Sequence, residues 1–517
     1  MSPHVDDLEM PSEEFKGTNG LDGIRNGSYS DHHDNHTFYD DAMRPLSATA
    51  GVNSYLEQTH PEEMHDLVCV GFGPASLAIA VALHDFLEQS KAPAELSSLR
   101  GRSPKVVFLE KQKQFAWHAG MLLPGAKMQI TFLKDMASLR NPRSEFTFIN
   151  YLFKHDRLVQ FTNLDTFLPQ RIEYEDYMRW CAQHFDNVVE YAQEGLEVLP
   201  EKSDRNSAQI DSFVVKSRDT GTGEVTARRA RHVVIAVGGR PSFPKAFPAN
   251  HPRVIHSSQY TSAVPNVLKE TLYPYSVAVV GAGQSAAEIF DTIHSQYPNS
   301  KTRLLIRGSA LRPSDDSPFV NEIFNPSSVD DVYHQSPELR ATALAADRAT
   351  NYGVVRLTLL EKIYSTLYTQ RIRLGPEEEK WPHRILSHRN VNQVEDSPVI
   401  PGGVRLHMSN RSGDFQCNAC NVDDEVLDVD LVLVASGYSR DAHEGLLRGA
   451  QWLKPAHDED KWTVQRNYRV KFTEGRVSND AGVWLQGCCE NTHGVSYNTL
   501  LVTDFFEWQH EFNFVIA

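Results

Sequence analysis

The chain has 517 residues and an ordinary composition for a folded protein, which predicts two or three domains. Its net charge of −16 disfavours nucleic acids and anionic membranes as partners. It contains no apolar run near the roughly 20 residues of a membrane span and no targeting signal that we identify, so we expect a cytoplasmic protein.

Residues 1–60 are rich in Asp, Glu, His, Asn, Ser and Gly and show no sustained apolar periodicity. Such a segment cannot bury enough apolar surface to offset the entropy of ordering. We therefore expect a disordered acidic tail, and a first globular unit that starts at about residue 61.

A strand, a glycine turn and a helix follow one another across residues 66–83. The apolar run Leu67–Val70 predicts a short buried strand, Gly71 and Gly73 form the turn, and an apolar helical pattern follows. In this arrangement backbone N–H groups at the helix N-terminus can hold a pyrophosphate. Ser76 replaces the third glycine of the usual motif, so an ordinary strand–turn–helix stays open at this point.

A second predicted strand, Lys105–Glu110, ends in an acid. In a dinucleotide site an acid at this strand tip accepts the ribose hydroxyls, although its distance from the first glycines is longer here than usual. After it, residues 111–151 interleave aromatic and polar side chains without a clean period, which suits loops that line a pocket.

The glycine motif occurs a second time, after a predicted strand at residues 276–280. Gly281 and Gly283 lead into a helix, and the next strand ends in Arg307 rather than in an acid. A guanidinium there can pair with the 2′-phosphate of NADP, although a plain surface arginine stays open. One nucleotide fold ending in an acid and a second ending in a base is the organisation of a flavin enzyme reduced by NADPH.

Further elements follow in chain order. Helical patterns are centred on residues 338–347 and 354–367, and residues 430–434 predict another buried strand. Cys417 and Cys420 form a single CxxC pair without nearby ligands at zinc spacing, so we expect no metal.

More specific sequence segments lie outside the glycine turns. They include FLKD around Lys134, DDSPFVNEIFNP around Asn321, and the strand at residues 430–438 with His443 beyond it. On these segments the chain resembles the microbial N-hydroxylating flavin monooxygenases over roughly residues 62–501. The resemblance implies an α/β fold with two Rossmann-like dinucleotide-binding domains, for FAD and NADPH, and a small, mostly helical substrate-binding region.

The resemblance also implies domain boundaries. The FAD-binding domain is expected at 61–245 and 426–517, the NADPH-binding domain at 246–310 and 371–425, and the helical substrate-binding region at 311–370.

The residues of the site follow from the resemblance position by position. It implies FAD contacts by Gly71, Gly73, Ser76, Glu110, Trp117, His118, Met128 and Gln129. It implies NADPH contacts by Ala282, Gly283, Gln284, Ser285 and Arg307, with Asn351 and Tyr352 close to the nicotinamide. Further cofactor contacts are implied for Arg171, Thr499, Leu500 and Leu501. Lys134, Asn321 and Val502 are expected to hold the substrate, and Lys134, Asn321 and Gln129 to act in catalysis.

The implied reaction is hydroxylation of the side-chain amine of L-ornithine by O₂, giving N(5)-hydroxy-L-ornithine for a hydroxamate siderophore. In the family, NADPH reduces FAD, and the reduced flavin forms a C4a-hydroperoxide whose distal oxygen the neutral amine attacks. A lysine suits the α-carboxylate as a point charge. We find no dedicated base in the sequence, so the site must lower the pKa of the amine by desolvation. Relatives suggest a homotetramer.

The C-terminal segment departs from the family pattern. Where the family reads approximately HGLSDTLLS, this chain continues from His493 as HGVSYNTLLV, so that Val502 replaces the final serine. Hydroxylation of lysine or another diamine and an inactive flavoprotein therefore stay open, as do a sulfur or Baeyer–Villiger oxygenase. A disulfide reductase is disfavoured because its CxxC would lie in the N-terminal half of the flavin domain.

Overall fold

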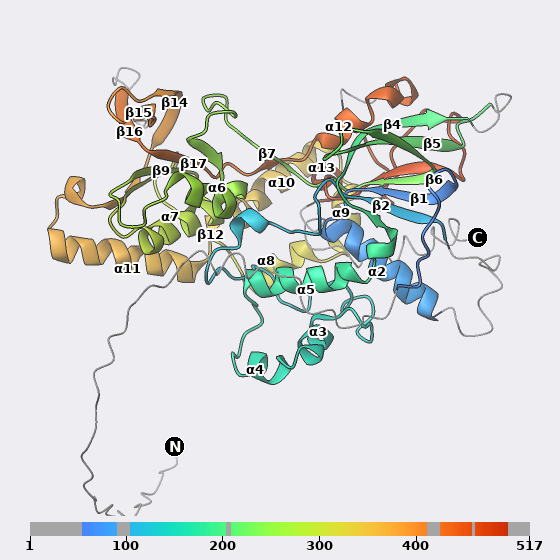
Figure 1. The fold of residues 1–517 in the computed structure, drawn as a ribbon, viewed down its shortest axis with the longest axis horizontal. Coiled ribbons are helices and arrows are strands. Elements are labelled where there is room, and N and C mark those ends of the chain that lie inside the picture. Colours follow the sequence, from blue (N-terminus) through green and yellow to red (C-terminus); the bar gives the residue numbers. More distant parts are fainter. Residues whose placement is uncertain (1–53, 90–103, 203–207, 411–423, 457–460, 495–517) are drawn as a thin grey trace, which may run out of the picture. The chain divides into compact units, whose positions relative to one another are not determined.

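The structure is a computed structural model that describes residues 54–89, 104–202, 208–410, 424–456 and 461–494 (Figure 1). Most of the expected tail, Cys417 and Cys420, and the segment Thr499–Val502 lie outside these residues. The predicted end of the tail at residue 60 is wrong, because Leu56 is only 1 % exposed and its carbonyl accepts a hydrogen bond from Asn187 at 2.7 Å. A single buried leucine in a polar stretch gives no periodicity from which this packing could be read.

The first glycine turn belongs to a seven-stranded sheet with the order β3-β2-β1-β6-β5-β4, in which β19 also pairs with β6. Strands β3, β2, β1, β6 and β19 are parallel, whereas β4 and β5 extend the sheet in antiparallel fashion. The bounds are β1 Met64–Val70, β2 Val106–Leu109, β3 Val189–Glu190, β4 Gln193–Glu201, β5 Ser212–Asp219, β6 Val225–Ile235 and β19 Gly482–Leu485.

The predicted apolar run Leu67–Val70 is confirmed as the buried part of β1, where no side chain is more than 1 % exposed. A central parallel strand is covered on both faces, which explains a continuous apolar run instead of alternation. Helices α2 (Pro74–Gln89) and α5 (Arg171–Gln183) lie below this sheet in Figure 1. Proline at the start of α2 fits a position whose N–H needs no helical partner.

The second glycine turn belongs to a five-stranded, wholly parallel sheet with the order β13-β10-β9-β17-β8. Its strands are β8 Val254–His256, β9 Ser276–Val280, β10 Lys301–Leu305, β13 His383–Leu386 and β17 Leu431–Val434. The strand predicted at residues 276–280 is therefore confirmed.

Both faces of this second sheet are buried. Val277 and Val279 pack in one core with α6 (Tyr260–Val267), α7 (Gln284–Gln296) and α11 (Leu357–Leu374), whereas Ala278 packs in another core. That second core lies under the antiparallel strands β14 Arg389–Asp396, β15 Val404–Asn410 and β16 Asp424–Val429. Figure 1 shows α7 and α11 on one side of the sheet and β14–β16 on the other. Neighbouring residues of β9 pack in different cores because successive side chains of a strand point to opposite faces of the sheet.

A helical segment lies between β10 and β13 in the chain. It contains β11 Arg312–Pro313, α8 Pro318–Asn321, η4 Glu322–Phe324, α9 Ser328–Tyr333, α10 Pro337–Asn351 and β12 Val354–Val355 before α11. The helical pattern predicted at 338–347 is confirmed as part of α10, and that predicted at 354–367 is confirmed from Leu357 onward as part of α11, whereas Val354 and Val355 form β12. Helices α9 and α10 pack against the short helix α13 (Glu490–His493) near the end of the described chain.

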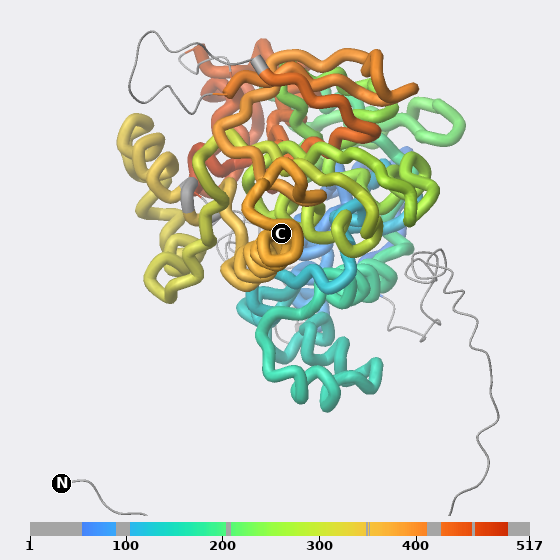
Figure 2. The backbone as a smooth tube through the Cα atoms, turned by 90° about the vertical axis from the view of Figure 1, so that its left-hand side faces the viewer, coloured from blue at the N-terminus to red at the C-terminus, as the bar shows by residue number. Residues whose placement is uncertain are grey.

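The remaining elements are short. Helices α3 (Phe148–Lys154) and α4 (Leu158–Thr162) lie at the end opposite β14–β16 in both Figure 1 and Figure 2. The others are α12 Ala442–Leu446, η1 Ala119–Met121, η2 Asp186–Val188, η3 Ser257–Gln259, η5 Glu378–Lys380 and η6 Arg448–Leu453. In the part of the chain that the structure describes, no helix is long and apolar enough to cross a lipid bilayer.

The chain passes between the two sheets through two adjacent segments. Strand β7 (Arg240–Pro241) leads away from the first sheet, β18 (Tyr438–Ser439) leads back, and the two pair antiparallel. The expected start of the C-terminal FAD segment at residue 426 needs correction, because β17 lies between β9 and β8 in the second sheet. Its apolar sequence suits either parallel sheet, so the pattern alone does not assign it.

Candidate functional site

The first glycine turn joins β1 to α2 and has the backbone of a tight turn. Gly71 has φ +97°, and a Cβ there would lie 2.6 Å from the carbonyl oxygen of Ala236, so only glycine fits. A Cβ on Gly73 would meet nothing within 4 Å. Ser76 is fully buried in the first turn of α2. The turn therefore has open space beside Gly73, where the N-terminus of α2 presents free N–H groups to an anion.

Glu110 lies directly beside this turn. Its carboxylate accepts a hydrogen bond from the Phe72 N–H at 2.7 Å and another from the Gln112 N–H at 2.9 Å. The residue is 6 % exposed, and these two bonds fix its orientation. A fixed carboxylate with remaining lone pairs can accept hydrogen bonds from a ribose.

The second glycine turn joins β9 to α7 in the same way. Gly281 has φ +143°, and a Cβ there would lie 2.5 Å from the carbonyl oxygen of Ala435. Ala282, Gly283, Gln284 and Ser285 are half-buried, and α7 begins at Gln284. Arg307 is exposed and lies just beyond β10, the strand next to β9. A guanidinium at this position can pair with a phosphate on the nucleotide ribose.

A chain of polar contacts connects the two halves of the site. Arg171, at the start of α5, donates hydrogen bonds of 3.0 and 2.9 Å to the two carboxylate oxygens of Glu288 on α7. Gln284 donates to Glu288 at 2.9 Å and accepts from the Arg356 N–H at 2.9 Å. The Arg356 guanidinium donates to the carbonyl oxygen of Gln129 at 2.6 Å. The two predicted residues Arg171 and Gln284 thus share one partner.

The aromatic part of the predicted flavin site is assembled around His118. The ring of Trp117 lies 4.7 Å from the ring of His118 and 6.3 Å from that of Tyr174. The backbone of His118 is left-handed, with φ +48°, at the start of η1. His118 is exposed as a whole residue, but the protein around its imidazole desolvates the ring. This desolvation, together with the nearby charges of Arg171 and Arg440, lowers the pKa of His118 to about 4. The ring is therefore neutral at pH 7.

Met128 and Gln129 are adjacent but differ in their surroundings. Met128 is 5 % exposed and packs in the core of the first sheet, whereas Gln129 is exposed and contacts Arg356 through its carbonyl. Both lie between η1 and Lys134 in the chain, and their places beside the flavin stay predictions.

Lys134 and the predicted substrate helix meet in the structure. The ammonium of Lys134 lies 5.9 Å from the ring centre of Phe324, which ends the short helix that follows Asn321. The lysine is half-buried, and desolvation lowers its pKa below the ordinary lysine value. Asn321 is exposed and donates through its side chain to the carbonyl oxygen of Asp316 at 3.1 Å. A partly desolvated ammonium is suited to an anionic group of a ligand.

Tyr352 connects the end of α10 to the C-terminal helix. Its hydroxyl donates a hydrogen bond of 2.6 Å to the carboxylate of Glu490 in α13. Asn351 is the last residue of α10, and its side chain is not among those described. Thr499, Leu500, Leu501 and Val502 lie outside the described residues, so their roles stay predictions.

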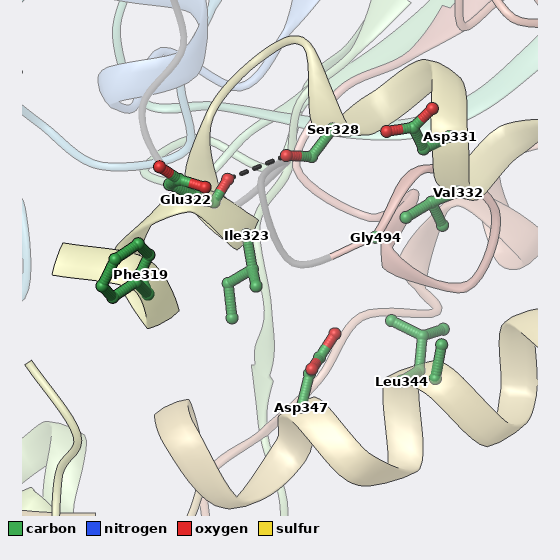
Figure 3. Close-up of a pocket in the computed structure, with 10 residues that line it drawn as sticks. Phe319, Glu322, Ile323, Ser328, Asp331, Val332, Leu344, Asp347 and Gly494 are labelled. Carbon is green, nitrogen blue, oxygen red and sulfur yellow. Dashed lines mark hydrogen bonds between the residues drawn. The ribbon is translucent and has the colours of Figure 1, made fainter. Parts of the chain in front are cut away.

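A separate cavity of about 280 Å³ lies within the helical segment (Figure 3). Carboxylates of Glu322, Asp331 and Asp347 surround it together with apolar side chains such as Ile323 and Leu344. Among the residues that the structure describes, none of the predicted site residues lines it, although Glu322 follows Asn321 in the chain.

Three residues of these contacts carry no predicted role: Glu288, Arg356 and Glu490. Glu288 follows Gln284 by four residues on a helix, and this spacing is a usable signal that the two side chains meet. Arg356 and Glu490 are far from their partners in the chain, so nothing in the sequence points to their contacts.

Comparison with known proteins places this geometry in context. The profile of the L-lysine 6-monooxygenase/L-ornithine 5-monooxygenase family matches residues 63–440. The chain is 61 % identical over 456 residues to an L-ornithine N(5)-monooxygenase of Cochliobolus heterostrophus, covering 87 % of this chain and 86 % of the relative.

Two solved structures are similar over nearly all of their length. The ornithine hydroxylase of Pseudomonas aeruginosa has a TM-score of 0.75 and 34 % identity, covering 88 % of this chain and 100 % of that protein. The ornithine N-hydroxylase of Kutzneria sp. 744, in a structure with reduced FAD, NADP⁺ and L-ornithine, has a TM-score of 0.75 and 30 % identity. It covers 87 % of this chain and 99 % of that protein.

Proposed function

The chain belongs to the L-lysine 6-monooxygenase/L-ornithine 5-monooxygenase family, and from this we propose that it hydroxylates the side-chain amine of L-ornithine. The reaction uses FAD, NADPH and O₂ and gives N(5)-hydroxy-L-ornithine for siderophore biosynthesis. The proposal that L-ornithine is the substrate rests on the 61 % identity, over most of both chains, to an ornithine monooxygenase.

The first glycine turn fits FAD. Gly71 supplies the backbone that only glycine adopts here, Gly73 leaves open space for the pyrophosphate, and Glu110 is held where a ribose is expected. When bound, FAD would accept a hydride from NADPH and pass electrons to O₂, which supplies the oxygen atom of the product. Trp117, neutral His118 and Met128 would then border the flavin.

The second turn fits NADPH. The N-terminus of α7 would take the pyrophosphate, with Gln284 and Ser285 in its first turn, and Arg307 would pair with the 2′-phosphate. Tyr352 and Asn351, at the end of α10, would lie close to the nicotinamide. The pyrophosphate and 2′-phosphate assignments are supported by the positions of Gln284, Ser285 and Arg307 just beyond the two parallel strands β9 and β10.

Lys134 and Asn321 would hold ornithine. The partly desolvated ammonium of Lys134 would bind the α-carboxylate, and the amide of Asn321 can both donate and accept hydrogen bonds. The reacting amine must be neutral, and burial of the substrate alone can lower its pKa. Exclusion of water by the residues around the site would serve this purpose.

The assembly and location of the enzyme are further parts of the proposal. We infer a cytoplasmic homotetramer. Support for association comes from α11, where Tyr364, Tyr368 and Ile372 are 72, 56 and 68 % exposed along one helix. Large apolar side chains exposed together suit a surface that a partner subunit covers.

The test is a product assay on the purified, FAD-loaded full-length protein. NADPH oxidation and hydroxylamine formation are measured with L-ornithine and, in parallel, with L-lysine. We expect product in proportion to NADPH with ornithine and little with lysine. Product from lysine but none from ornithine would favour the diamine alternative. FAD binding without product from either would identify an inactive flavoprotein.

A further inference from the structure

Arg356 contacts three segments of the proposed site, which we name α7, the flavin loop (residues 128–134) and the substrate segment (residues 312–324). Its backbone N–H donates to the side-chain oxygen of Gln284, the first residue of α7, at 2.9 Å. Its guanidinium donates to the carbonyl oxygen of Gln129 at 2.6 Å and to a carboxylate oxygen of Asp316 at 3.2 Å. All three segments therefore meet at one arginine.

The backbone on both sides of Arg356 is held by hydrogen bonds. Strands β11 and β12 pair Pro313 with Val355, and the N–H of Ser314 donates to the Val355 carbonyl oxygen at 2.9 Å. The Arg356 carbonyl oxygen accepts from the N–H of Leu360 at 3.1 Å and so begins α11. The arginine side chain thus starts from a main chain that is fixed between a short sheet and a helix.

Both acceptors of the guanidinium precede a predicted substrate residue in the chain. Gln129 lies five residues before Lys134, and Asp316 lies five residues before Asn321. The amide of Asn321 also donates to the Asp316 carbonyl oxygen at 3.1 Å. One side chain therefore connects the two segments whose residues are proposed to hold ornithine.

These contacts are better explained by positioning than by stability of the fold. The side chain of Arg356 is 19 % exposed and that of Asp316 is 55 % exposed, and a pair with an exposed partner is worth little. The Nε atom of Arg356 is buried without a hydrogen-bond partner among the described residues, which costs free energy. What the guanidinium does provide is geometry, because its planar fork holds two acceptors in set directions.

We propose that Arg356 is a positioning residue for hydroxylation, whose guanidinium fixes the flavin loop against the substrate segment. This inference rests on the proposed function. With both segments fixed, Lys134 and Asn321 hold the side-chain amine of ornithine at one place beside the flavin. A displacement of about 1 Å at a reacting atom can cost about a hundredfold in rate. When the amine is misplaced, NADPH and a proton reduce O₂ to hydrogen peroxide, and the amine stays unmodified.

The contact with Gln284 separates the two halves of the reaction. It comes from the backbone of Arg356, so every side chain other than proline keeps this N–H. Loss of the guanidinium should therefore leave α7 and the reduction of the flavin by NADPH close to the wild type. Only the use of ornithine should change.

The test compares Arg356→Met and Arg356→Lys with the wild type, each as the FAD-loaded full-length protein. Methionine removes the charge and the donors, whereas lysine keeps a point charge without the planar fork. In both variants we expect hydroxylated product per NADPH to fall by about tenfold, within the range for a small misplacement, with hydrogen peroxide formed instead. Stopped-flow reduction by NADPH should be nearly unchanged. Arg373→Ala, exposed on α11, is the control and should match the wild type in both measurements.

Amide hydrogen exchange gives a second measurement that does not depend on activity. In Arg356→Met, peptides of the flavin loop and the substrate segment should exchange faster than in the wild type, and peptides of α7 should not. Equal exchange in both segments, or a wild-type product yield in either variant, would overturn the inference. Arg356→Lys decides the matter if methionine prevents folding. A wild type that gives no hydroxylated ornithine would instead overturn the proposed function, and this role with it.

Discussion

Arg171 and Glu288 form a buried ion pair with two hydrogen bonds, and it connects α5, which covers the first sheet, to α7 of the second. The side chains are 12 and 7 % exposed. Through Gln284, Glu288 also reaches the first turn of α7, where NADPH is proposed to bind. The pair therefore connects the two elements beside which the nucleotides are proposed to bind.

Breaking this pair should destabilise the protein. We expect Glu288→Ala to lower the free energy of unfolding by about 3 kcal/mol, because it leaves a buried guanidinium without its charge partner. The double variant with Arg171→Ala should lose less than the two single variants together. Thermal unfolding of each variant measures this. Glu377→Ala, which breaks an exposed pair with Lys380, is the control and should leave the midpoint unchanged.

The two glycines of the first turn should fail in different ways when replaced by alanine. Gly71→Ala should destabilise the fold itself, because its Cβ collides with a carbonyl oxygen at φ +97°. Gly73→Ala should fold with a nearly unchanged unfolding midpoint, because its Cβ has free space. That space is proposed for the FAD pyrophosphate, so FAD affinity should fall. Flavin content after purification and titration of flavin-depleted protein measure this. If Gly73→Ala retains FAD fully, the space beside Gly73 does not hold the FAD pyrophosphate.

Lys134→Ala should raise the apparent KM for ornithine by about tenfold to a hundredfold, the range expected for losing one charge-assisted contact. The rate of flavin reduction by NADPH should stay close to that of the wild type, because Lys134 is assigned to the substrate alone. Stopped-flow reduction and steady-state kinetics separate the two. Lys127→Ala, an exposed lysine in the same loop, is the matched control. An apparent KM for ornithine equal to that of the wild type would contradict the proposed contact between Lys134 and the substrate.

Arg307→Ala should narrow the preference for NADPH over NADH. Only NADPH has the 2′-phosphate, so its kcat/KM should fall by about tenfold or more while that of NADH changes little. Arg373→Ala, on the exposed side of α11, should leave the ratio unaltered. If the ratio is also unaltered in Arg307→Ala, another cation binds that phosphate.

His383 should make the second sheet sensitive to acid. The ring is 1 % exposed, neither nitrogen has a hydrogen-bond partner among the described residues, and burial, followed by His294 and Arg303, lowers its pKa to about 3. Between pH 6.5 and about 3 the unfolded chain binds a proton that the folded one does not, so stability falls as pH decreases. Its contribution is fully present above pH 6.5.

Replacing the His383 ring should reduce the loss of stability at acidic pH. We expect His383→Phe to lose less stability than the wild type between pH 7 and pH 5, as measured by thermal unfolding at both values. His334→Phe, at an exposed position, should follow the wild type. An identical pH dependence in His383→Phe and the wild type would mean that other groups control the response.

Much of the fold could be predicted because its central elements carry local signals. The runs Leu67–Val70 and Val277–Val280 are apolar throughout, as is typical of buried parallel strands, and each leads into a glycine turn. What failed was the choice between sheets. The strand at residues 431–434 is as apolar as the strands of both sheets. Only its pairing with β8 and β9 shows that it belongs to the second sheet.

The positions of Glu110 and Arg307 just beyond two strands could be predicted, because each follows an apolar run in the sequence; their roles stay predictions. The site was not predictable where contacts join distant segments. Arg356 reaches Gln129 across more than two hundred residues, and Tyr352 reaches Glu490. No periodicity or spacing encodes such pairs, because they depend on how whole elements pack.

The return of β19 to β6 has a consequence for synthesis of the chain. Strand β6 ends at Ile235 and β19 begins at Gly482, and the whole second sheet is made in between. At the usual pace of translation this interval lasts about 10 to 50 seconds. Throughout it, residues 232–235 of β6, of which Val233, Val234 and Ile235 are apolar, lack the partner strand β19, and such open edges can pair with other chains. This part of β6 thus stays open to other chains on the ribosome until β19 has been made.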